Sequence, residues 1–518
     1  MSRFSKLTRA SFLIAFFFGL DKILGFGRLI LVARQFKLAP EFSAFNIANN
    51  VPDLLFMLIS GGALGMAFIP VLTETLTKEG REQAWDLFSR VANLAFLATG
   101  GLALVIALLA EPLVKSQFGV APGFGPEQQE MVIEMMRLNL VATLIFSISG
   151  LVMAGLQSNQ HFLLPAMAPL LYNLGQLFGA LVLAPEQGLS IGPIQLPAFG
   201  MGVFGLVYGV IIGAALHLLI QLPGLARYGF HWTRRIGLNT EPVRRVLVLL
   251  GPRVVTMLLI QLTFIVRDNL ASRLPDPGSV TLLTYGWTIM QVPETLIGTA
   301  IGIAILPTLS ELVARGEREA FQAAVERAMQ VIIAVTIPIA FLMMVGLEPL
   351  LAVVFDFGPE GTESLLWVTR GFLVGLTGQC LKEVAVRSFY SRRDAITPVI
   401  TAGINLVVYI VLGIILFQRM GAPGISLTDS LAFTSEAILL IFLLNRYLVR
   451  SGIPAVTPGS ALLHGLLAAL VGGGLVVLVG MLPFADSLPF MMGLAALGLG
   501  GLAALFPISK EIRLLLRL

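Results

Sequence analysis

Residues 11–34 read SFLIAFFFGLDKILGFGRLILVAR, an apolar run with Asp21, Lys22 and Arg28 inside it. A bilayer core about 30 Å thick needs about 20 apolar residues in each spanning helix. The run meets this length and continues to Arg34 without the small-residue cleavage site that ends a signal peptide. It therefore predicts an uncleaved first transmembrane helix with ionisable side chains inside the membrane.

Similar runs recur along most of the 518 residues. Hydrophobic residues make up 56% of the chain and charged residues 12%, and the mean hydropathy is +0.89. Such a composition has too few charges to coat a soluble surface of this size. We expect an all-α membrane protein with about fourteen transmembrane helices. The predicted spans are 11–34, 43–72, 84–112, 131–156, 162–184, 199–226, 246–273, 278–313, 320–354, 364–391, 395–417, 424–445, 458–482 and 486–508.

Loop charges give an independent test of this topology, because cytoplasmic loops carry an excess of Lys and Arg. One side receives Arg3, Lys6, Arg9, Lys78, Arg81, Arg227, Arg234, Arg235, Arg244, Arg245, Arg315, Arg318, Arg392, Arg393, Arg446, Arg450, Lys510, Arg513 and Arg517. The other side receives little more than Lys37, Lys115, Arg273 and Arg419. The alternation predicts a multi-pass protein of the bacterial cytoplasmic (inner) membrane with both termini in the cytoplasm.

Two short matches indicate an internal repeat. Ala67–Glu74 resembles Ala304–Glu311, and Ser158–Pro165 corresponds to Ser391–Pro398. Both offsets are about 235 residues, or six predicted helices, and an even number of helices preserves orientation in the membrane. We expect two six-helix lobes, residues 1–230 and 231–450, related by a pseudo-two-fold axis along the membrane normal. Residues 451–518 would add two further helices, and a substrate cavity would lie between the lobes.

The ionisable residues of the first helix are costly, since a charge near the bilayer centre costs about 2.5 kcal/mol or more. Asp21, Gly25 and Arg28 share one helical face, and Lys22 lies about 100° around from Asp21. These residues could form a cationic cavity wall for an anionic substrate, with Gly25 permitting close approach. Alternatively, Asp21 is neutralised by Lys22 or by a neighbouring helix.

The seventh predicted helix occupies the equivalent place in the second lobe and carries Arg253, Gln261, Arg267 and Asp268. Both helices would then line one cavity, although Arg267 and Asp268 lie toward the outer end and could form an interfacial ion network instead. Arg28, Lys22, Arg267 and Arg253 are the candidate substrate-binding residues, and Asp21 and Asp268 the candidates for coupling to an ion or proton. In the tenth helix, Glu383 and Arg387 have the spacing of a structural ion pair, and Lys382 and Arg370 are weaker cavity candidates.

Gly and Pro interrupt several predicted helices. Pro52, Gly61 and Gly62 lie in the second, and Pro293 and Gly298 in the eighth. Such breaks can act as hinges, or they can be static kinks whose backbone groups are satisfied by neighbouring helices.

Signatures of other functions are missing from the sequence. Cys380 is the only cysteine, which excludes an intramolecular disulfide, and the four histidines lack metal-ligand spacing. No Walker A or GxSxG motif is present, so we expect a transporter without ATP hydrolysis, metal or cofactor. The net charge of +4 is explained by the loops and does not indicate nucleic-acid binding. Membrane potential or a monovalent cation could supply the energy.

Collinear motifs over residues 10 to 450 resemble one known family. They include Leu24-Gly25-Phe26-Gly27-Arg28, Val51-Pro52-Asp53-Leu54-Leu55, Pro165-Ala166-Met167-Ala168-Pro169 with Asn173, Leu306-Pro307-Thr308-Leu309-Ser310, and Phe389-Tyr390-Ser391-Arg392-Arg393-Asp394. The chain is similar to the MurJ/MviN family of lipid II flippases, within the multidrug/oligosaccharidyl-lipid/polysaccharide exporter superfamily. The resemblance implies translocation of undecaprenyl-diphosphate-linked peptidoglycan precursor to the outer leaflet, with a lipid-tail groove at the last two helices. Its implied partners are this lipid-linked glycan, membrane lipids and cell-wall synthesis proteins.

Departures from the family pattern keep other functions open. Phe56 and Thr288 stand where family members commonly carry arginine, whereas Arg28 and a cation at Lys22 remain. Arg267 or Arg253 would then complete a relocated cation set. The alternatives are export of another lipid-linked oligosaccharide or drug/cation antiport in the same superfamily, and, from other classes, a membrane glycosyltransferase or a non-transporting cell-wall scaffold.

Overall fold

The computed structural model describes residues 3–59, 62–188, 190–191, 194–238, 240–482 and 488–515. It is nearly all helical, and its contacts divide the chain into two compact units, Met1–Arg273 and Leu274–Leu518. The fold class expected from the sequence, an all-α membrane protein, is confirmed.

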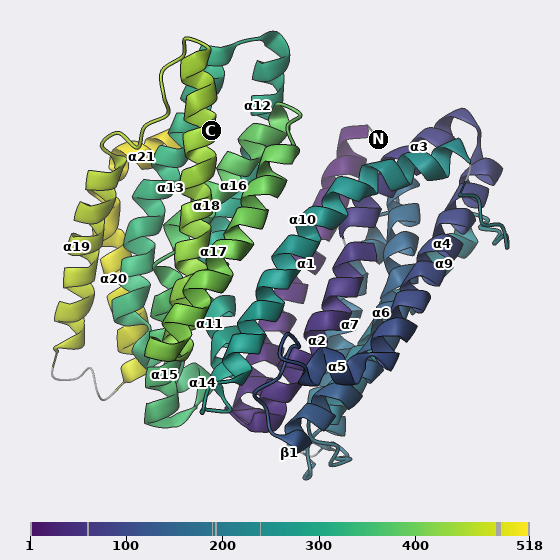
Figure 1. The fold of residues 1–518 in the computed structure, drawn as a ribbon, viewed down its shortest axis with the longest axis horizontal. Helices are drawn as coiled ribbons and strands as arrows, with labels where there is room; N and C mark the ends of the chain where they lie inside the picture. The colour runs from purple at the N-terminus through teal and green to yellow at the C-terminus, as the bar shows by residue number, and fades with distance from the viewer. Residues whose placement is uncertain are drawn as a thin grey trace. The chain divides into compact units, whose positions relative to one another are not determined.

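The first unit contains α1 (Arg3–Phe36), α2 (Pro40–Ile59), α3 (Gly62–Lys78), α4 (Arg81–Leu108), α5 (Ala110–Lys115), α6 (Pro126–Ser158), α7 (Leu163–Phe178), the π-helix η1 (Gly179–Leu183), the two-residue strands β1 (Ser190–Ile191) and β2 (Ile194–Gln195), α8 (Val203–Leu219), α9 (Leu222–Arg227) and α10 (Glu241–Ser272). The strands pair antiparallel. Figure 1 shows the long helices of this unit lying side by side.

The second unit contains α11 (Ser279–Glu294), the π-helix η2 (Thr295–Thr299), α12 (Ala300–Arg315), α13 (Arg318–Gly346), α14 (Glu348–Phe355), α15 (Gly358–Leu373), α16 (Leu376–Ser391), α17 (Ile396–Met420), α18 (Ala422–Arg450), α19 (Ala461–Gly480), α20 (Pro489–Leu505) and α21 (Ser509–Leu515). The helices α19, α20 and α21 lie beside α13 (Figure 1). They share an apolar core with it.

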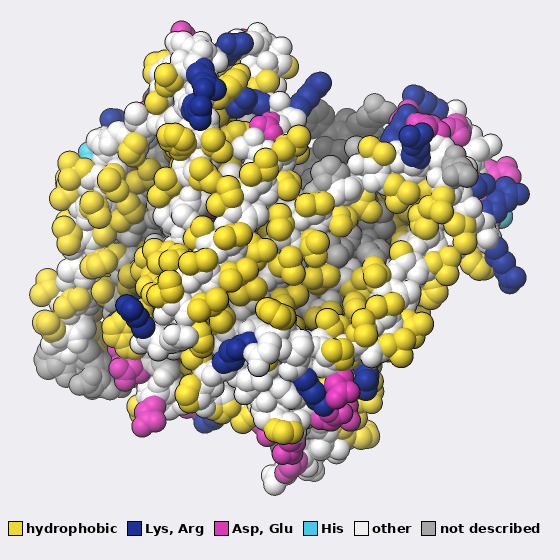
Figure 2. Space-filling model, in the orientation of Figure 1, with side chains coloured by type: hydrophobic (Ala, Val, Ile, Leu, Met, Phe, Trp, Pro, Cys, Tyr) yellow, Lys and Arg dark blue, Asp and Glu magenta, His cyan; other side chains and the backbone are white. Residues whose placement is uncertain are grey.

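Within the part of the chain that the structure describes, ten helical segments are long and apolar enough to cross a membrane. The other four spans predicted from the sequence coincide with α1, with α2 and α3, with α15 and α16, and with α20. The count of fourteen crossings stays a prediction. Figure 2 shows, on one face, hydrophobic side chains over the middle of the helices and charged side chains gathered near their ends, as a lipid environment favours.

The helix α10 packs with the first unit, although the sequence repeat assigns it to the second lobe. Val243 and Val246 of α10 join an apolar core with Trp85 and Phe88 of α4. The contact boundary therefore falls after residue 273 rather than near residue 230. The contact boundary shows which helices pack together, whereas the sequence repeat shows which segments are related. The lobe boundaries and their symmetry axis therefore stay a prediction.

The two turns that carry the second repeat motif have the same backbone geometry. Gln160 and Arg393 both adopt a positive φ, of 57° and 61°. His161 N donates to Leu156 O at 2.9 Å, and Asp394 N donates to Phe389 O at 3.0 Å. Few non-glycine residues adopt this conformation, so its recurrence at equivalent positions supports the repeat.

The structure also aligns repeat motifs that the sequence analysis overlooked. Phe124-Gly125-Pro126-Glu127 leads into α6, and Phe357-Gly358-Pro359-Glu360 leads into α15. The Val-Pro pair at 51–52 precedes Asp53 in α2, and the pair at 292–293 precedes Glu294 in α11. An acidic residue thus follows the same proline in each half of the chain.

Glycines let α7 and α8 approach closely. A Cβ atom added at Gly175 would lie 2.3 Å from the Gly213 Cα, and one at Gly179 would lie 2.7 Å from the Gly209 Cα. Small residues four positions apart commonly create such contacts between membrane helices, where packing rather than the hydrophobic effect drives association. This contact fixes α7, which carries Tyr172 and Asn173, against the rest of the unit.

Candidate substrate site

The helix α1 places Asp21 against α7. Asp21 is 9% exposed, and its Oδ1 accepts a hydrogen bond of 2.7 Å from Asn173 Nδ2. Lys22 Nζ lies 3.9 Å from Asp21 Oδ2, but its side chain is 81% exposed. The main partner of Asp21 is therefore the amide of a neighbouring helix, as one of the two sequence interpretations expected.

Arg28 lies two turns further along α1 and is half-buried. Arg28 and Asp53 of α2 are both within electrostatic range of Tyr172 of α7. Packing does not require a glycine at position 25, because an added Cβ would lie 3.7 and 3.8 Å from atoms of Asn173, which is ordinary van der Waals contact. The polar groups of α1, α2 and α7 thus gather around Tyr172 and Asn173, and a substrate-binding role for Arg28 and Lys22 stays a prediction.

The C-terminal half of α10 forms a second polar group with α2. Arg267 and Asp268 are 6% and 3% exposed, and Arg267 Nε lies 3.8 Å from Asp268 Oδ1. Asn50 Nδ2 donates to Asp268 Oδ2, and Gln261 Nε2 donates to Asn50 O at 3.3 Å. The guanidinium of Arg267 also lies 4.6 Å from the centre of the Phe264 ring, at cation–π distance. These residues form a buried polar network, and the roles of Arg267 in substrate binding and of Asp268 in ion coupling stay predictions.

The remaining predicted residue of α10 is Arg253, which lies within the helix while its side chain is outside the described residues. A cavity lined by both α1 and α10 stays a prediction.

The helix breaks differ from one another in structure. Pro52 is buried in α2, and its carbonyl accepts from Thr143 Oγ1 at 3.4 Å, as in a kink satisfied by a neighbour. Gly62 begins α3, and Gly61 lies outside the described residues. Pro293 lies two residues before the π-helix η2, which contains Gly298. Proline removes a backbone donor, and π-turns often occur at functional sites, so η2 is the best-formed hinge candidate.

Gly298 is also required by packing, since an added Cβ would lie 2.8 Å from the Cys380 Cα. The neighbouring helix α16 contains the predicted ion pair, which is confirmed because Arg387 Nη1 donates to the Glu383 carboxylate. Lys382 of α16 lies near Glu436 of α18, and the sequence analysis did not connect these two residues. The contact could not be predicted because Lys382 and Glu436 are far apart in the sequence. An acidic residue within an apolar helix, such as Glu436, nevertheless indicates that a partner is needed.

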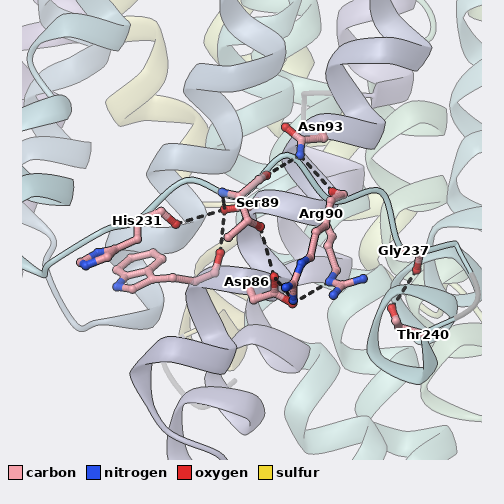
Figure 3. A network of polar contacts seen from close by, with 10 residues as sticks. Asp86, Ser89, Arg90, Asn93, His231, Gly237 and Thr240 are labelled. Atoms are coloured by element: carbon pink, nitrogen blue, oxygen red, sulfur yellow. Dashed lines mark hydrogen bonds and ion pairs between the residues drawn. The ribbon is translucent and has the colours of Figure 1, made fainter.

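The segment after α9 folds back onto α4 through a polar network that the sequence did not reveal (Figure 3). Asn93 Nδ2 donates to Thr233 O at 2.8 Å and to Arg235 O at 3.0 Å. Asp86 accepts from Arg90 Nε at 2.6 Å and from Thr233 Oγ1 at 3.1 Å. The network holds the charged loop between α9 and α10, which the loop charges assign to the cytoplasm.

A cavity of about 850 Å³ adjoins this network. Its charged lining residues are Glu79, Arg81, Glu82, Asp86, Arg90 and Arg235. Because three acidic and three basic side chains line it, the lining favours neither an anionic nor a cationic ligand. The cavity is better explained by the docking of the loop than by substrate binding.

A membrane protein of this kind, with polar groups clustered on several of its spanning helices, belongs to the class of polytopic transporters. The structure matches a solved protein described as lipid II flippase MurJ in an inward closed conformation, with a TM-score of 0.77 and 19% identity over 98% of this chain and 100% of the other. It also matches a multidrug resistance MATE family transporter of the MOP superfamily, in an inward-facing conformation, with a TM-score of 0.66 and 16% identity over 83% of this chain and 95% of the other.

The sequence comparisons give the family. The model of the lipid II flippase MurJ family matches residues 32–485. A curated relative from Burkholderia cenocepacia, named lipid II flippase MurJ, is 28% identical over 85% of this chain and 84% of its own length. One from Bdellovibrio bacteriovorus, named probable lipid II flippase MurJ, is 26% identical over 91% and 87%. This chain belongs to the lipid II flippase MurJ family.

Proposed function

We propose that this chain translocates lipid II, the undecaprenyl-diphosphate-linked peptidoglycan precursor, from the inner to the outer leaflet for cell-wall synthesis. Family membership over residues 32–485 is the observation that carries the proposal. Drug/cation antiport is less well supported, because the likeness to the MATE transporter is one of fold at 16% identity.

The polar residues of the first unit suit a diphosphate head group. Arg and Lys bind phosphate oxygens through charge-assisted hydrogen bonds, and Arg28 offers such a group at a half-buried position on α1. Lys22, Arg267 and Arg253 are the further proposed cations, and Asp21 and Asp268 the groups that keep them oriented or respond to a coupled ion. The polyprenyl tail would remain in lipid, beside a groove at α19 and α20.

Alternating access is the proposed mechanism. Two six-helix lobes would rock about the bound diphosphate, with bending at Gly25, Pro52, Gly61, Gly62, Pro293 and Gly298, and expose it first inward and then outward. No ATP hydrolysis is proposed, so the membrane potential or a monovalent cation would drive the cycle. The protein would lie in the bacterial cytoplasmic membrane with both termini inside and could contact cell-wall synthesis proteins there.

The decisive experiment is rescue of a bacterium depleted of its own lipid II flippase. Expression of this chain should restore growth, cell shape and the outward movement of lipid II, measured by its accessibility to a periplasmic probe. Normal expression in the membrane without outward movement of lipid II would contradict the proposal. Movement of a different lipid-linked oligosaccharide in the same cells would instead support the exporter alternative.

A further inference from the structure

The second unit contains a buried ionic network that the proposed substrate site does not use. Glu436 of α18 is 7% exposed, and its Oε2 accepts from Asn405 Nδ2 of α17 at 3.0 Å. Thr401 Oγ1 donates to Glu436 Oε1 at 3.5 Å. Lys382 Nζ lies 4.0 Å from Glu436 Oε2 and 4.1 Å from the centre of the Phe433 ring. The carboxylate is thus held by two neutral donors and one distant cation.

Two more carboxylates belong to the same network. Glu294, at the end of α11, is 6% exposed and accepts from Thr299 Oγ1 at 3.0 Å and from Thr295 Oγ1 at 3.3 Å. It lies within electrostatic range of Lys382 and Glu383 of α16. Glu383 is paired with Arg387 on its own helix.

Among the described residues, charged groups near Glu436 come from several neighbouring helices. Lys382 and Glu383 of α16 lie within electrostatic range of Glu436, and the same two residues lie within range of Glu294 of α11. Arg387 joins the network through its ion pair with Glu383. The helix α17 supplies the neutral donors Thr401 and Asn405. On α18, Asp429 lies about two turns before Glu436 and accepts from Tyr409 Oη at 3.2 Å. Arg370 of α15 is directed to Met344 O of α13, at 2.8 Å. The network therefore has three carboxyl groups, Glu294, Glu383 and Glu436, against two cations, Lys382 and Arg387.

The first unit has a neutral counterpart of this contact. Lys382 and Ser149 lie as far apart in the sequence as Ser391 and Ser158, the serines of the two repeat turns. Lys382 and Ser149 are therefore equivalent positions of the repeat. Gly421 and Gly202 directly precede α18 and α8 and have similar φ angles, of 62° and 56°. Glu436 and His217 lie as far apart in the sequence as these two glycines, so they are equivalent positions of the repeat.

Ser149 Oγ and His217 Nδ1 lie 2.7 Å apart, and Gln221 Nε2 donates to Ser149 Oγ at 3.0 Å. The equivalent helices are thus joined by a hydroxyl–imidazole contact in one half of the chain and by an ammonium–carboxylate contact in the other. The charge is a property of the second unit rather than of the shared fold.

An excess negative charge beside the buried Glu294 and Glu436 is costly, because an uncompensated buried ion loses its hydration. Binding one proton balances the network. We propose that the network of Glu294, Lys382, Glu383, Arg387 and Glu436 holds one exchangeable proton and couples transport to the proton gradient. A carboxylate oxygen takes the proton from water on one side and releases it to water on the other, so no further reactant is needed. The coupling role rests on the proposed function, whereas proton binding does not.

Charge-matched variants test the proposal. Glu436→Gln and Glu294→Gln each leave two carboxylates against two cations, so the bound proton should be lost. The double variant K382M/E436Q again has one excess carboxylate, so the proton should return. Glu111→Gln changes an exposed carboxylate of α5 and is the matched control. Folding of each purified variant is checked by its unfolding temperature.

Two measurements are made on the full chain. Infrared spectroscopy detects the carbonyl band of a protonated carboxyl group as the pH is varied. Lipid II flipping in proteoliposomes is measured with and without a pH gradient at a clamped potential. We expect the band and the gradient dependence to be lost in both single variants, kept in E111Q, and the band to return in K382M/E436Q.

The outcomes separate the two proposals. Persistence of the full band and of the gradient dependence in both E436Q and E294Q overturns the proton site. Dependence on a sodium gradient in place of a pH gradient also overturns it. If the wild-type chain does not flip lipid II, the proposed function fails, and the infrared result still decides whether the network binds a proton.

Discussion

Arg28 is the residue whose role follows most directly from its position. It lies half-buried on α1, within electrostatic range of Tyr172 of α7. A guanidinium in this setting can donate several hydrogen bonds to a diphosphate without changing its own charge.

Arg28→Ala should slow lipid II flipping. A hydrogen bond to a charged group contributes about 1.5–3 kcal/mol, which corresponds to a loss of about ten- to a hundredfold in rate. The initial rate is measured in proteoliposomes at equal protein content. Arg419→Ala, at the exposed end of α17, is the control and should flip at the wild-type rate. An undiminished rate for R28A would remove Arg28 from the proposed site.

Asp394 has a structural role in the turn before α17. Its Oδ1 accepts from the backbone N of Ile396 and Thr397, at 3.1 and 3.0 Å, and its Oδ2 accepts from Thr397 Oγ1 at 2.7 Å. Burial alone would raise the pKa of Asp394, but these hydrogen bonds outweigh burial and lower the pKa below its ordinary value of 3.8. The charged carboxylate therefore stabilises the folded state.

Asp394→Ala should destabilise the protein by about 1 kcal/mol, as loss of a helix cap does. Because the folded pKa is lowered, this stabilisation is complete above the ordinary pKa and is lost as the pH falls through the lowered value. The difference in unfolding temperature between wild type and D394A should therefore be constant near neutral pH and shrink in acid. Glu360→Ala, at the exposed start of α15, is the control. An equal difference at all pH values would contradict the explanation.

At the scale of helices, the spacing of glycines determines how closely α7 and α8 pack. Gly175, Gly179, Gly205, Gly209 and Gly213 recur every four residues, so each set lies on one face of its helix. The backbone of each helix enters the space that a side chain would occupy on the other. Polar residues of α7 are held in place by this packing.

Gly175→Ala should therefore destabilise the first unit, even though alanine favours helices. The added Cβ would lie 2.3 Å from the Gly213 Cα, and overpacking of this kind costs about 1–3 kcal/mol. The unfolding temperature in detergent should fall. Gly101→Ala in α4 is the matched control, since no atom lies within 4 Å of its added Cβ. A fall of equal size in both variants would show that the close approach is not responsible.

At the scale of the whole molecule, the two halves share turns, motifs and helix order but differ in their buried charges. Topology is the property that the distribution of loop charges predicts most directly, and it can be tested without any assay of transport. Cys380 is the only cysteine and is buried, so a Cys380→Ser background allows single-site labelling.

Glu317→Cys, between α12 and α13, should react with a membrane-impermeant thiol reagent only after the membrane is opened. Phe118→Cys, after α5 and 95% exposed in the wild type, should react in intact spheroplasts. The reason is that arginine-rich loops remain in the cytoplasm during insertion. The opposite labelling pattern would invert the proposed orientation, and equal labelling at both sites would contradict the five crossings predicted between them.

The sequence by itself determined the all-helical membrane fold, the family and the repeat, because hydrophobic run length, loop charge and collinear motifs are local in the chain. It also predicted the Glu383–Arg387 pair, which depends on spacing within one helix. It did not predict that Asp21 contacts Asn173, that Asp268 contacts Asn50, or that Lys382 lies beside Glu436. Those contacts join helices distant in sequence, and only tertiary packing decides which faces of two apolar helices meet.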